Sequence, residues 1–446
     1  MLINRPSFAS IKYFLAALAF AFPFSSFASE FNLNGALPDL PAYGFELPEV
    51  KAPAAPVMKE WTVMVFVNGK NNLEEYAMMD VNEMELAGST GKVNIAVELG
   101  RMNGQHEGDD LSEGGWTGVR RYLIAKDDDK KRIASPVLDH RDKADMGSWK
   151  ELVDFIQWAK ARYPARRYAL ILWDHGYGWK PLDPANAPDF TNTKSFSFDD
   201  ETGHEISTLQ ITAALKAVGG VNFLMLDGCN MQMASVAYEV KDLAEVLVAS
   251  EESEPGVVLR YGELMGRLIR KPGLGPEEFG LNAVRIYRDY FTTGGGYNEG
   301  TVLTQSAVRL SKVSVLREKL DAWAALAVNA EKEVLASAKK NCKAYDDPEF
   351  KDLHHFISLV TAGTRDAALK AAGGELAKFI RSELVLENWA QDKNSAGMSI
   401  YVPDAYDPLY DTLAWSKDGA WDDFAKLMAA LPPSAPAKIG APLNPR

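Results

Sequence analysis

Cysteine is nearly absent from this sequence. Its 446 residues include two cysteines, Cys229 and Cys342, which excludes a fold stapled by several disulfides, and a chain of this length buries a sizeable core without them. One bridge between the two thiols is conceivable in an oxidising compartment, and it would contradict a free cysteine nucleophile. Cys342 lies in a polar stretch that predicts a surface loop without chemistry of its own.

Long hydrophobic runs are missing after the first 28 residues. Residues 1–28 carry Arg5 and Lys12, then an apolar stretch over 13–24 and small residues up to Ala28, which is typical of a secretory signal peptide cleaved after Ala28. An uncleaved membrane anchor is the alternative, but the apolar stretch is shorter than the roughly 20 residues that span a bilayer. The sequence predicts an exported protein, periplasmic or extracellular, with no membrane attachment after signal removal.

Positive charge is also in short supply. The chain has 48 Lys and Arg against 61 Asp and Glu, a formal net charge of −13 that becomes −15 when the signal peptide takes two positive charges away. Nucleic acid and anionic membranes would be repelled, so neither is an expected partner. Basic peptides suit an acidic surface, although the solubility of an exported protein explains the charge equally well. The sequence contains no internal repeat, dinucleotide-binding loop or phosphate-binding loop.

Two unbroken apolar runs lead to chemically reactive side chains. Residues 223–226 are apolar without alternation, as in a strand buried on both faces of a parallel sheet, and Cys229 follows them. Residues 168–173 form a second run of this kind, and His175 follows it. Carboxyl ends of parallel strands meet at one edge of a sheet, where ligands bind in open α/β folds. The two side chains are therefore expected at the same edge.

A thiol beside an imidazole is the usual requirement for nucleophilic catalysis by cysteine. The separation of 54 residues leaves room for a loop and a crossover helix over 209–218. Helical spacing after Cys229 indicates a strand-to-helix turn, and a helix N-terminus there would favour the thiolate. A lone cysteine or histidine at a strand end is more often a core residue. A cysteine and a histidine at equivalent ends of two predicted strands together support the hypothesis of a Cys-His dyad.

Several motifs around these residues resemble the clostripain family of cysteine peptidases, in the clan of caspases, gingipains and legumain. The motifs are WTVMVFVNGKNNL at 61–73, WDHGYGW at 173–179, DGCNM at 227–231, AYE at 237–239 and SEESEP at 250–255. The likeness covers residues 60–260 well and continues more weakly to about 425. It implies a caspase-like fold and an endopeptidase that works through an acyl-enzyme.

The order of predicted elements favours the same fold class. Strands alternate with helices over 61–261, which indicates an α/β fold with a doubly wound, mostly parallel sheet flanked by helices. Residues 262–431 are mainly helical, and the resemblance implies that they pack on and extend the catalytic domain. Proline-rich residues 29–60 predict a leader or linker, and 432–446 a disordered tail. The predicted strands are 63–67, 93–99, 120–124, 168–173, 223–226, 246–249, 301–308 and 397–402; the predicted helices are 71–87, 149–162, 209–218, 276–291, 312–339, 348–362 and 365–384.

The resemblance also implies roles for the residues around the dyad. Cys229 would be the nucleophile and His175 the general acid for the departing amine, with the backbone N–H groups of Gly176 and Cys229 as the oxyanion hole. Asp227 would line the primary specificity pocket and select arginine or lysine; on the residues alone, a turn-forming aspartate is an equal alternative. Glu254 is a further candidate for substrate binding.

Two more positions bear on specificity. Glu251 lies in the same loop as Glu254, after the last predicted core strand, and that loop often borders the cleft. Lys70 stands where members of the resembled family commonly have an acidic residue. Because a lysine near the pocket would disfavour a basic substrate side chain, the preference for arginine or lysine is a hypothesis.

Activation and metal binding are further expectations drawn from the resemblance. Peptidases that resemble clostripain are commonly activated by cleavage between the histidine and the cysteine, which makes Lys194 the candidate processing site and Lys180, followed by proline, the poorer one. An uncut surface loop is the alternative. The acidic run 199–201 is either a calcium site, since some family members use calcium, or a solvated charge run, since it lacks the spaced ligands of a recognised calcium loop.

Two other functions stay open. A non-catalytic exported binding or scaffold protein would keep the fold without needing both His175 and Cys229, and a peptide ligase or transpeptidase would use the same acyl-enzyme. The expected partner is a peptide or protein substrate, with no required cofactor. No metal site is predicted, because the adjacent His354 and His355 point about 100° apart on a helix.

Overall fold

The computed structural model describes residues 58–102, 114–129, 131–180, 196–256, 259–293, 296 and 302–432. The predicted signal peptide, most of the predicted leader and the tail from residue 433 lie outside these residues. Within the described ranges, every helix is too short or too polar to cross a membrane.

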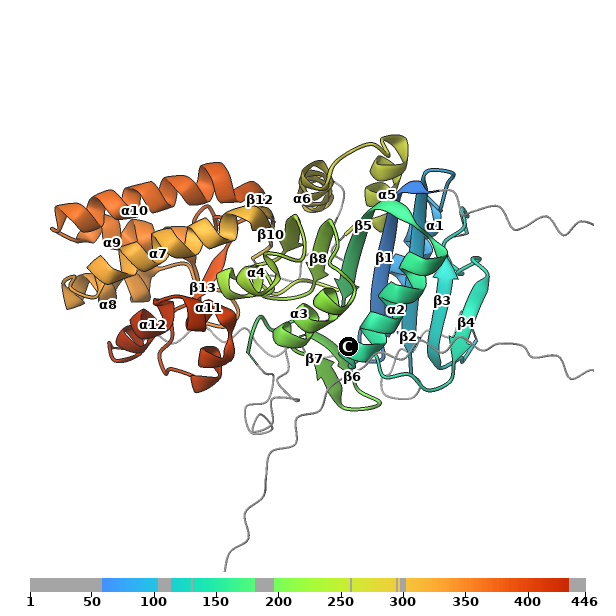
Figure 1. The fold of residues 1–446 in the computed structure, drawn as a ribbon, viewed down its shortest axis with the longest axis horizontal. Coiled ribbons are helices and arrows are strands. Elements are labelled where there is room, and N and C mark those ends of the chain that lie inside the picture. The colour runs from blue at the N-terminus through green and yellow to red at the C-terminus, as the bar shows by residue number, and fades with distance from the viewer. Residues whose placement is uncertain are drawn as a thin grey trace, which may run out of the picture. The chain divides into compact units, whose positions relative to one another are not determined.

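A nine-stranded mixed sheet organises the described residues, in the order β12-β10-β9-β8-β5-β1-β2-β3-β4 (Figure 1). Its five central strands are parallel: β2 (Val93–Arg101), β1 (Lys59–Gly69), β5 (Ala165–Trp173), β8 (Phe223–Asp227) and β9 (Val246–Ala249). Antiparallel strands extend both sides, with β3 (Gly118–Leu123) and β4 (Val137–Arg141) beyond β2, and β10 (Thr304–Arg309) and β12 (Val385–Ala390) beyond β9. The predicted fold class is confirmed.

The central strands are largely apolar because both faces of the sheet are covered. All five residues of β8 are buried. Its alternate side chains enter two different cores, Leu224 and Leu226 on one face and Phe223 and Met225 on the other. A strand with two buried faces has no polar side to show in its sequence, which is why these runs lack alternation.

Helices cover each face of the sheet. α2 (Trp149–Arg162), α3 (Thr208–Ala217) and α4 (Ala234–Val240) pack on the face turned toward the viewer in Figure 1. α1 (Glu74–Glu85), α5 (Tyr261–Arg270) and α6 (Pro276–Thr292) pack on the opposite face. A short hairpin, β6 (Phe196–Asp199) and β7 (His204–Ile206), lies between β5 and α3 in the chain and faces the carboxyl end of β1.

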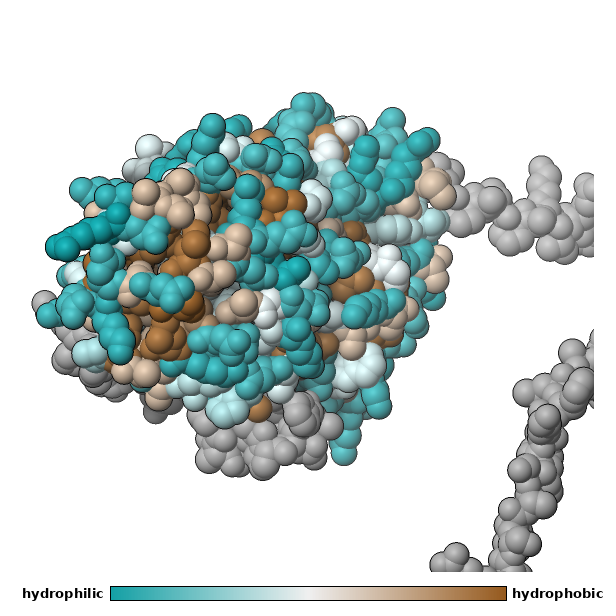
Figure 2. Space-filling model, turned by 60° about the vertical axis from the view of Figure 1, so that its left-hand side comes forward, coloured by the Kyte–Doolittle hydropathy of each residue, from teal (hydrophilic) through white to brown (hydrophobic). Residues whose placement is uncertain are grey.

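The C-terminal region shares the core of the α2–α4 face. Its helices are α7 (Val313–Ala327), α8 (Lys332–Asn341), α9 (Leu353–Gly363), α10 (Ala367–Phe379), α11 (Ala414–Asp418) and α12 (Trp421–Ala429), with a small sheet of β11 (Phe350–Asp352) and β13 (Ser399–Tyr401). Trp323, Trp415 and Trp421 are buried in that common core. On the outside, the face formed by these helices carries a hydrophobic patch framed by hydrophilic residues (Figure 2). The predicted mainly helical extension is confirmed.

Three expectations about this region are wrong. The single helix expected over 312–339 is two helices, α7 and α8, because the backbone of Glu331 is not helical (ψ 124°) and its carboxylate accepts the backbone N–H of Arg365. The helix expected over 348–362 begins instead with strand β11, which pairs with β13. Cys342, expected in a surface loop, is buried where α8 ends.

Candidate active site

β5 and β8 end side by side at one edge of the sheet. Trp173 pairs with Asp227 in their parallel ladder, so the residues that follow leave the sheet at the same level. His175 lies two residues beyond Trp173, and Cys229 lies two residues beyond Asp227. Both reactive side chains are half-buried. The structure therefore brings the two predicted residues to neighbouring turns.

The two turns pack backbone against backbone, and glycine makes this contact feasible. A Cβ atom on Gly176 would lie 2.5 Å from the carbonyl oxygen of Cys229 and 3.1 Å from its backbone nitrogen. A Cβ atom on Gly228 would clash with the carbonyl oxygen of Asp174. Neither clash involves a flexible side chain that is free to move aside, so glycine is required at both positions.

His175 is held by residues from two other segments. Its Nε2 lies 2.7 Å from Oδ1 of Asn72, in the turn after β1, and its ring meets Phe198 of β6 edge-on, with 5.8 Å between centroids. Burial lowers the pKa of His175 to about 4. The imidazole is therefore neutral near neutral pH. Sequence reasoning missed Asn72, although it lies within the motif at 61–73.

The thiol of Cys229 faces the loop that follows β9. The backbone N–H of Glu254 donates to its Sγ at 3.2 Å, and no hydrogen bond of the described residues joins Cys229 to His175. Burial raises the pKa of Cys229 to about 12. The expected thiolate at a helix N-terminus is wrong for this structure, because α4 is a short helix that begins at Ala234. Cys229 and Cys342 are both free thiols.

Carboxyl groups gather beside the cysteine turn. Asp227 is buried, as is Asp80 of α1, and Glu254 is half-buried. We call these three residues the acidic cluster. Asp227 accepts the hydroxyl of Tyr261, while its Oδ1 and the Oε2 of Glu254 have no hydrogen-bond partner among the described residues. No lysine or arginine among the described residues forms an ion pair with any member of the cluster.

The pKa values in the acidic cluster are raised chiefly by burial, and no ion pair of the described residues offsets this effect. Burial raises the pKa of Asp227 to about 6. Burial and the charge of Asp227 together raise the pKa of Glu254 well above its usual range, and the same two causes act on Asp80. Neighbouring buried carboxyls resist ionising together, so the cluster favours any positive group that enters it. Asp80 was missed by sequence reasoning, because an aspartate within an acidic helix has no distinguishing pattern.

Lys70 points away from the acidic cluster. Its buried ammonium lies 2.6 Å from Glu201 and 3.4 Å from Asp199, and it donates to the carbonyl oxygen of Ala144. These contacts neutralise the lysine at the β6–β7 hairpin, so the expected opposition to a basic substrate side chain has no support in the structure. They also place a cation on the acidic run 199–201, which disfavours a metal ion there.

The described residues offer no group of three or more His, Cys, Asp and Glu side chains arranged for a metal ion. His354 and His355 have separate partners: His354 accepts from Arg381, and His355 accepts from the backbone N–H of Lys343.

Glu251 lies in a different cluster from Glu254. The hydroxyl of Tyr345 donates to Oε1 of Glu251 at 2.7 Å and lies 3.4 Å from Oδ2 of Asp352. The backbone N–H of Gly397 donates to Oε2 of Glu251 at 3.1 Å. Glu251 thus ties the loop after β9 to the β11–β13 sheet, and the structure gives no support to its expected place in the specificity pocket.

Of the two candidate processing positions, only Lys180 is among the described residues; Lys194 lies outside them. The ammonium of Lys180 lies 2.7 Å from Asp347 and 2.6 Å from Glu349. Two ion pairs and substantial burial make Lys180 a poor site for proteolysis.

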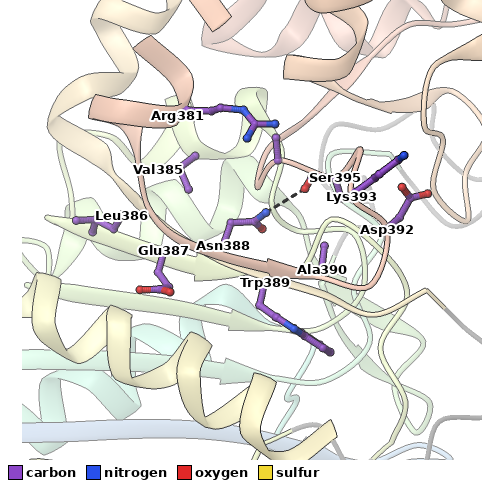
Figure 3. A pocket seen from close by; sticks show the side chains of 11 residues that line it. Arg381, Val385, Leu386, Glu387, Asn388, Trp389, Ala390, Asp392, Lys393 and Ser395 are labelled. Atoms are coloured by element: carbon purple, nitrogen blue, oxygen red, sulfur yellow. Dashed lines mark hydrogen bonds between the residues drawn. The ribbon is translucent and has the colours of Figure 1, made fainter. Parts of the chain in front are cut away.

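A groove of about 480 Å³ follows β12, the outermost strand on one side of the sheet (Figure 3). All six residues of β12 line it, and successive side chains of a strand point to opposite faces, so the groove runs along the open edge of the strand. Two lining residues are joined by a hydrogen bond, because the side-chain amide of Asn388 donates to the carbonyl oxygen of Ser395 at 3.0 Å. Cys229 and His175 are not among the residues that line this groove, so it is distinct from the candidate active site.

Comparisons with known proteins agree with this geometry. The model of the clostripain family, peptidase family C11, matches residues 65–427. Clostripain from Hathewaya histolytica is 24% identical over 234 residues, which are 49% of this chain and 44% of clostripain, so the chain spans less than half of that relative.

Two solved structures share the fold. A secreted C11 cysteine protease from Bacteroides thetaiotaomicron, in complex with an irreversible peptide inhibitor, matches with a TM-score of 0.60 and 20% identity over 83% of this chain and 99% of its own. An inactive zymogen C11 protease from Parabacteroides distasonis matches with a TM-score of 0.58 and 17% identity over 82% of this chain and 99% of its own. At these identities the likeness establishes the fold.

Proposed function

Because the chain belongs to the clostripain family, we propose that it is an exported cysteine endopeptidase with Cys229 as nucleophile and His175 as acid–base partner. The observation that supports this most is the placement of both residues in the adjacent turns after β5 and β8, pressed together through Gly176 and Gly228. Neither a binding protein nor a scaffold needs this pairing of a thiol with an imidazole.

The proposed reaction begins from two uncharged groups. The thiol passes its proton to the neutral imidazole of His175 as its sulfur attacks the substrate carbonyl, and the imidazolium then gives that proton to the departing amine. The backbone N–H groups of Gly176 and Cys229 are the proposed donors to the oxyanion. Water then takes the place of the amine and hydrolyses the acyl-enzyme, which frees the thiol.

We propose that the acidic cluster binds an arginine or lysine side chain of the substrate. A guanidinium or ammonium group beside Asp227 and Glu254 would supply a partner for their unpaired oxygens, and it would lower the pKa of both carboxyls by favouring their charged forms. The neutralised position of Lys70 supports this proposal, since no lysine or arginine of the described residues forms an ion pair with the cluster.

Export and activation are proposed on two further grounds. Residues 1–28 have the pattern of a signal peptide, and the similar protease from B. thetaiotaomicron is described as secreted. The similar protein from P. distasonis is an inactive zymogen. Because Lys180 is held in ion pairs, Lys194 is the proposed cleavage position. Residues 61–261 are proposed to carry the catalytic groups, and residues 262–431 to complete their core.

The deciding experiment is hydrolysis of fluorogenic peptides ending in arginine, lysine or a neutral residue, under reducing conditions, by the protein without residues 1–28. We expect Cys229→Ala to abolish turnover. We expect Asp227→Asn to lower kcat/KM for basic peptides by about 10²-fold, the equivalent of about 3 kcal/mol, because it removes the charge that meets the substrate cation. Asp242→Asn, a change of an exposed aspartate outside the cluster, should have no effect.

The other outcomes identify the alternatives. Turnover that depends on Cys229 but ignores the charge of the peptide would keep the peptidase and discard the acidic cluster as its pocket. Transfer of the acyl group to an added amine in preference to water would indicate a ligase or transpeptidase. No turnover of any peptide that depends on Cys229, even after a deliberate cut near Lys194, would favour a binding protein. Repeating the assay with a calcium chelator tests whether calcium is needed.

A further inference from the structure

We propose that Asn72 is the positioning residue for His175: its side-chain oxygen holds the proton of the imidazole on Nε2, which leaves Nδ1 free to accept the proton of Cys229. This inference rests on the proposed function and adds the group that orients its acid–base residue.

The contact that suggests this role joins two different strand ends. Asn72 follows β1, His175 follows β5, and the two strands are neighbours in the sheet, so both residues emerge at the same edge. Oδ1 of Asn72 lies 2.7 Å from Nε2 of His175. A neutral imidazole has one N–H donor and one acceptor nitrogen, and a carbonyl oxygen only accepts. With Oδ1 facing the ring, the proposed tautomer carries its proton on Nε2 and its lone pair on Nδ1.

The turn that carries Asn72 is anchored on both sides of this residue. Before it, the amide of Asn71 donates to Oδ1 of Asp174 at 2.7 Å and to the carbonyl oxygen of Phe198 at 2.8 Å. After it, the backbone N–H of Leu73 donates to Oδ1 of Asn71 at 2.9 Å. The side chain of Asn72 is exposed, and the hydrogen bonds of its two neighbours hold the backbone position from which its oxygen reaches the ring.

The carboxylate of Asp174 connects the histidine turn with the turn that carries Asn72. This buried residue immediately precedes His175, and its Oδ2 accepts the amide of Asn68 at 3.0 Å and the backbone N–H of Phe198. The turn after β1, strand β6 and the histidine turn therefore meet at one side chain. The Asn72–His175 contact is thus set by the fold before any substrate arrives.

An amide partner has a different electrostatic effect from a carboxylate partner. A carboxylate beside an imidazole stabilises the charged ring, whereas an amide oxygen orients the ring with little effect on its charge. This agrees with a His175 whose pKa is lowered to about 4 by burial and is not restored by a neighbouring charge. Phe198 packs on the ring edge-on and limits its rotation further.

The test compares Asn72→Ala and Asn72→Asp with the unchanged protein. Asn72→Ala should lower kcat by about 10–10²-fold with little change in KM, because the ring loses its fixed tautomer and orientation. Asn72→Asp keeps an acceptor oxygen, so it should recover most of this activity at high pH. Its carboxylate should also raise the pKa of His175, which moves the acid limb of the kcat/KM profile to higher pH by about one unit or more. Glu75→Gln, an exposed change in α1, serves as the control.

A second measurement does not need activity. In protein carrying Cys229→Ala, the ¹⁵N chemical shifts of His175 should show the proton on Nε2, and adding Asn72→Ala should give a mixture of both tautomers. An Nδ1–H tautomer, or an Asn72→Ala variant with unchanged kcat and unchanged tautomer, would overturn the positioning role. Absence of any peptide hydrolysis together with the expected shifts would instead overturn the proposed peptidase and leave the Asn72 contact intact.

Discussion

At the scale of single residues, Cys229 and His175 are both held in their uncharged forms. Burial raises the pKa of Cys229 to about 12 and lowers that of His175 to about 4, so a thiol and a neutral imidazole coexist near neutral pH. The backbone of Glu254 rests on the sulfur while its carboxyl lies beside Asp227. A substrate that enters the acidic cluster has to share this space with Glu254, so its binding is coupled to the environment of the nucleophile.

The protonated thiol leads to a prediction about alkylation. Iodoacetamide reacts with the thiolate, so a thiol with a pKa near 12 should react slowly at pH 7, and its rate should rise about tenfold per pH unit up to pH 10. Mass spectrometry of peptides containing Cys229 would follow the reaction in protein without ligand, with free cysteine alkylated alongside as the reference. A rate that is already at its plateau at pH 7 would show that the thiolate forms without substrate and would contradict this account.

At the scale of elements, the site depends on how closely the turns after β5 and β8 approach. A methyl group on Gly176 would meet the backbone of Cys229, and one on Gly228 would meet the backbone of Asp174. Forcing an extra methyl group into a closely packed site typically costs about 1–3 kcal/mol. The two turns have to move apart to relieve the steric clash, and this movement displaces both reactive groups.

We therefore expect Gly176→Ala and Gly228→Ala to lower peptide hydrolysis by at least about 10²-fold and to lower the temperature of unfolding. Gly273→Ala is the matched control, since a Cβ atom there meets nothing within 4 Å. Hydrolysis rates and thermal melting of the three variants would be measured side by side. Full activity in Gly176→Ala would mean that the two turns need not touch in the working enzyme.

The elements that the sequence predicts best are the buried parallel strands. β1, β2, β5, β8 and β9 appear as largely apolar runs because burial of both faces disfavours polar positions. The polar side chains that they do carry, such as Asn94 and Glu98 of β2, are buried with partners. β12 was missed, since an edge strand with half-buried residues mixes Val385 and Leu386 with Glu387 and Asn388 and has no clear period. β4, β6 and β7 are short; β4 lies at the edge of the large sheet, and β6 and β7 form a hairpin.

The site was predictable to the extent that strand ends determine it. His175 and Cys229 follow two buried strands, and parallel pairing places them together. The neutralisation of Lys70 was not predictable, because its partner Glu201 is far away in the sequence and meets the lysine only in the folded chain. Asn72 is one of many polar residues after a strand, and only the folded chain shows that its oxygen meets an imidazole.

At the scale of the whole described chain, the central sheet is built from two regions of the sequence. Residues up to 261 supply seven of the nine strands in the described sheet, and β10 and β12 come from the C-terminal region. β10 covers the edge of β9, and the C-terminal helices share the hydrophobic core of α2–α4. The turns that carry His175 and Cys229 therefore depend for their stability on the C-terminal region.

We expect a chain that ends at residue 261 to be unable to fold into the native sheet. It would expose β9 as an unpaired edge and uncover both hydrophobic cores, which favours aggregation. The protein from residue 29 to 446 should instead unfold in a single cooperative transition, with circular dichroism and intrinsic fluorescence changing together. Two separate transitions, or a stable and soluble protein ending at 261, would show that the C-terminal region is an independent domain.

The contact between the histidine and cysteine turns also has a consequence for how this family changes over evolutionary time. A descendant that abandons catalysis is free to replace His175 or Cys229, because either side chain is half-buried and can be exchanged without disturbing the core. It is not free to replace Gly176 or Gly228 while keeping the fold, because the backbones of the two turns already fill the space. We expect inactive relatives to keep both glycines after they have lost His175 or Cys229, so that the glycines still identify them as members of the family.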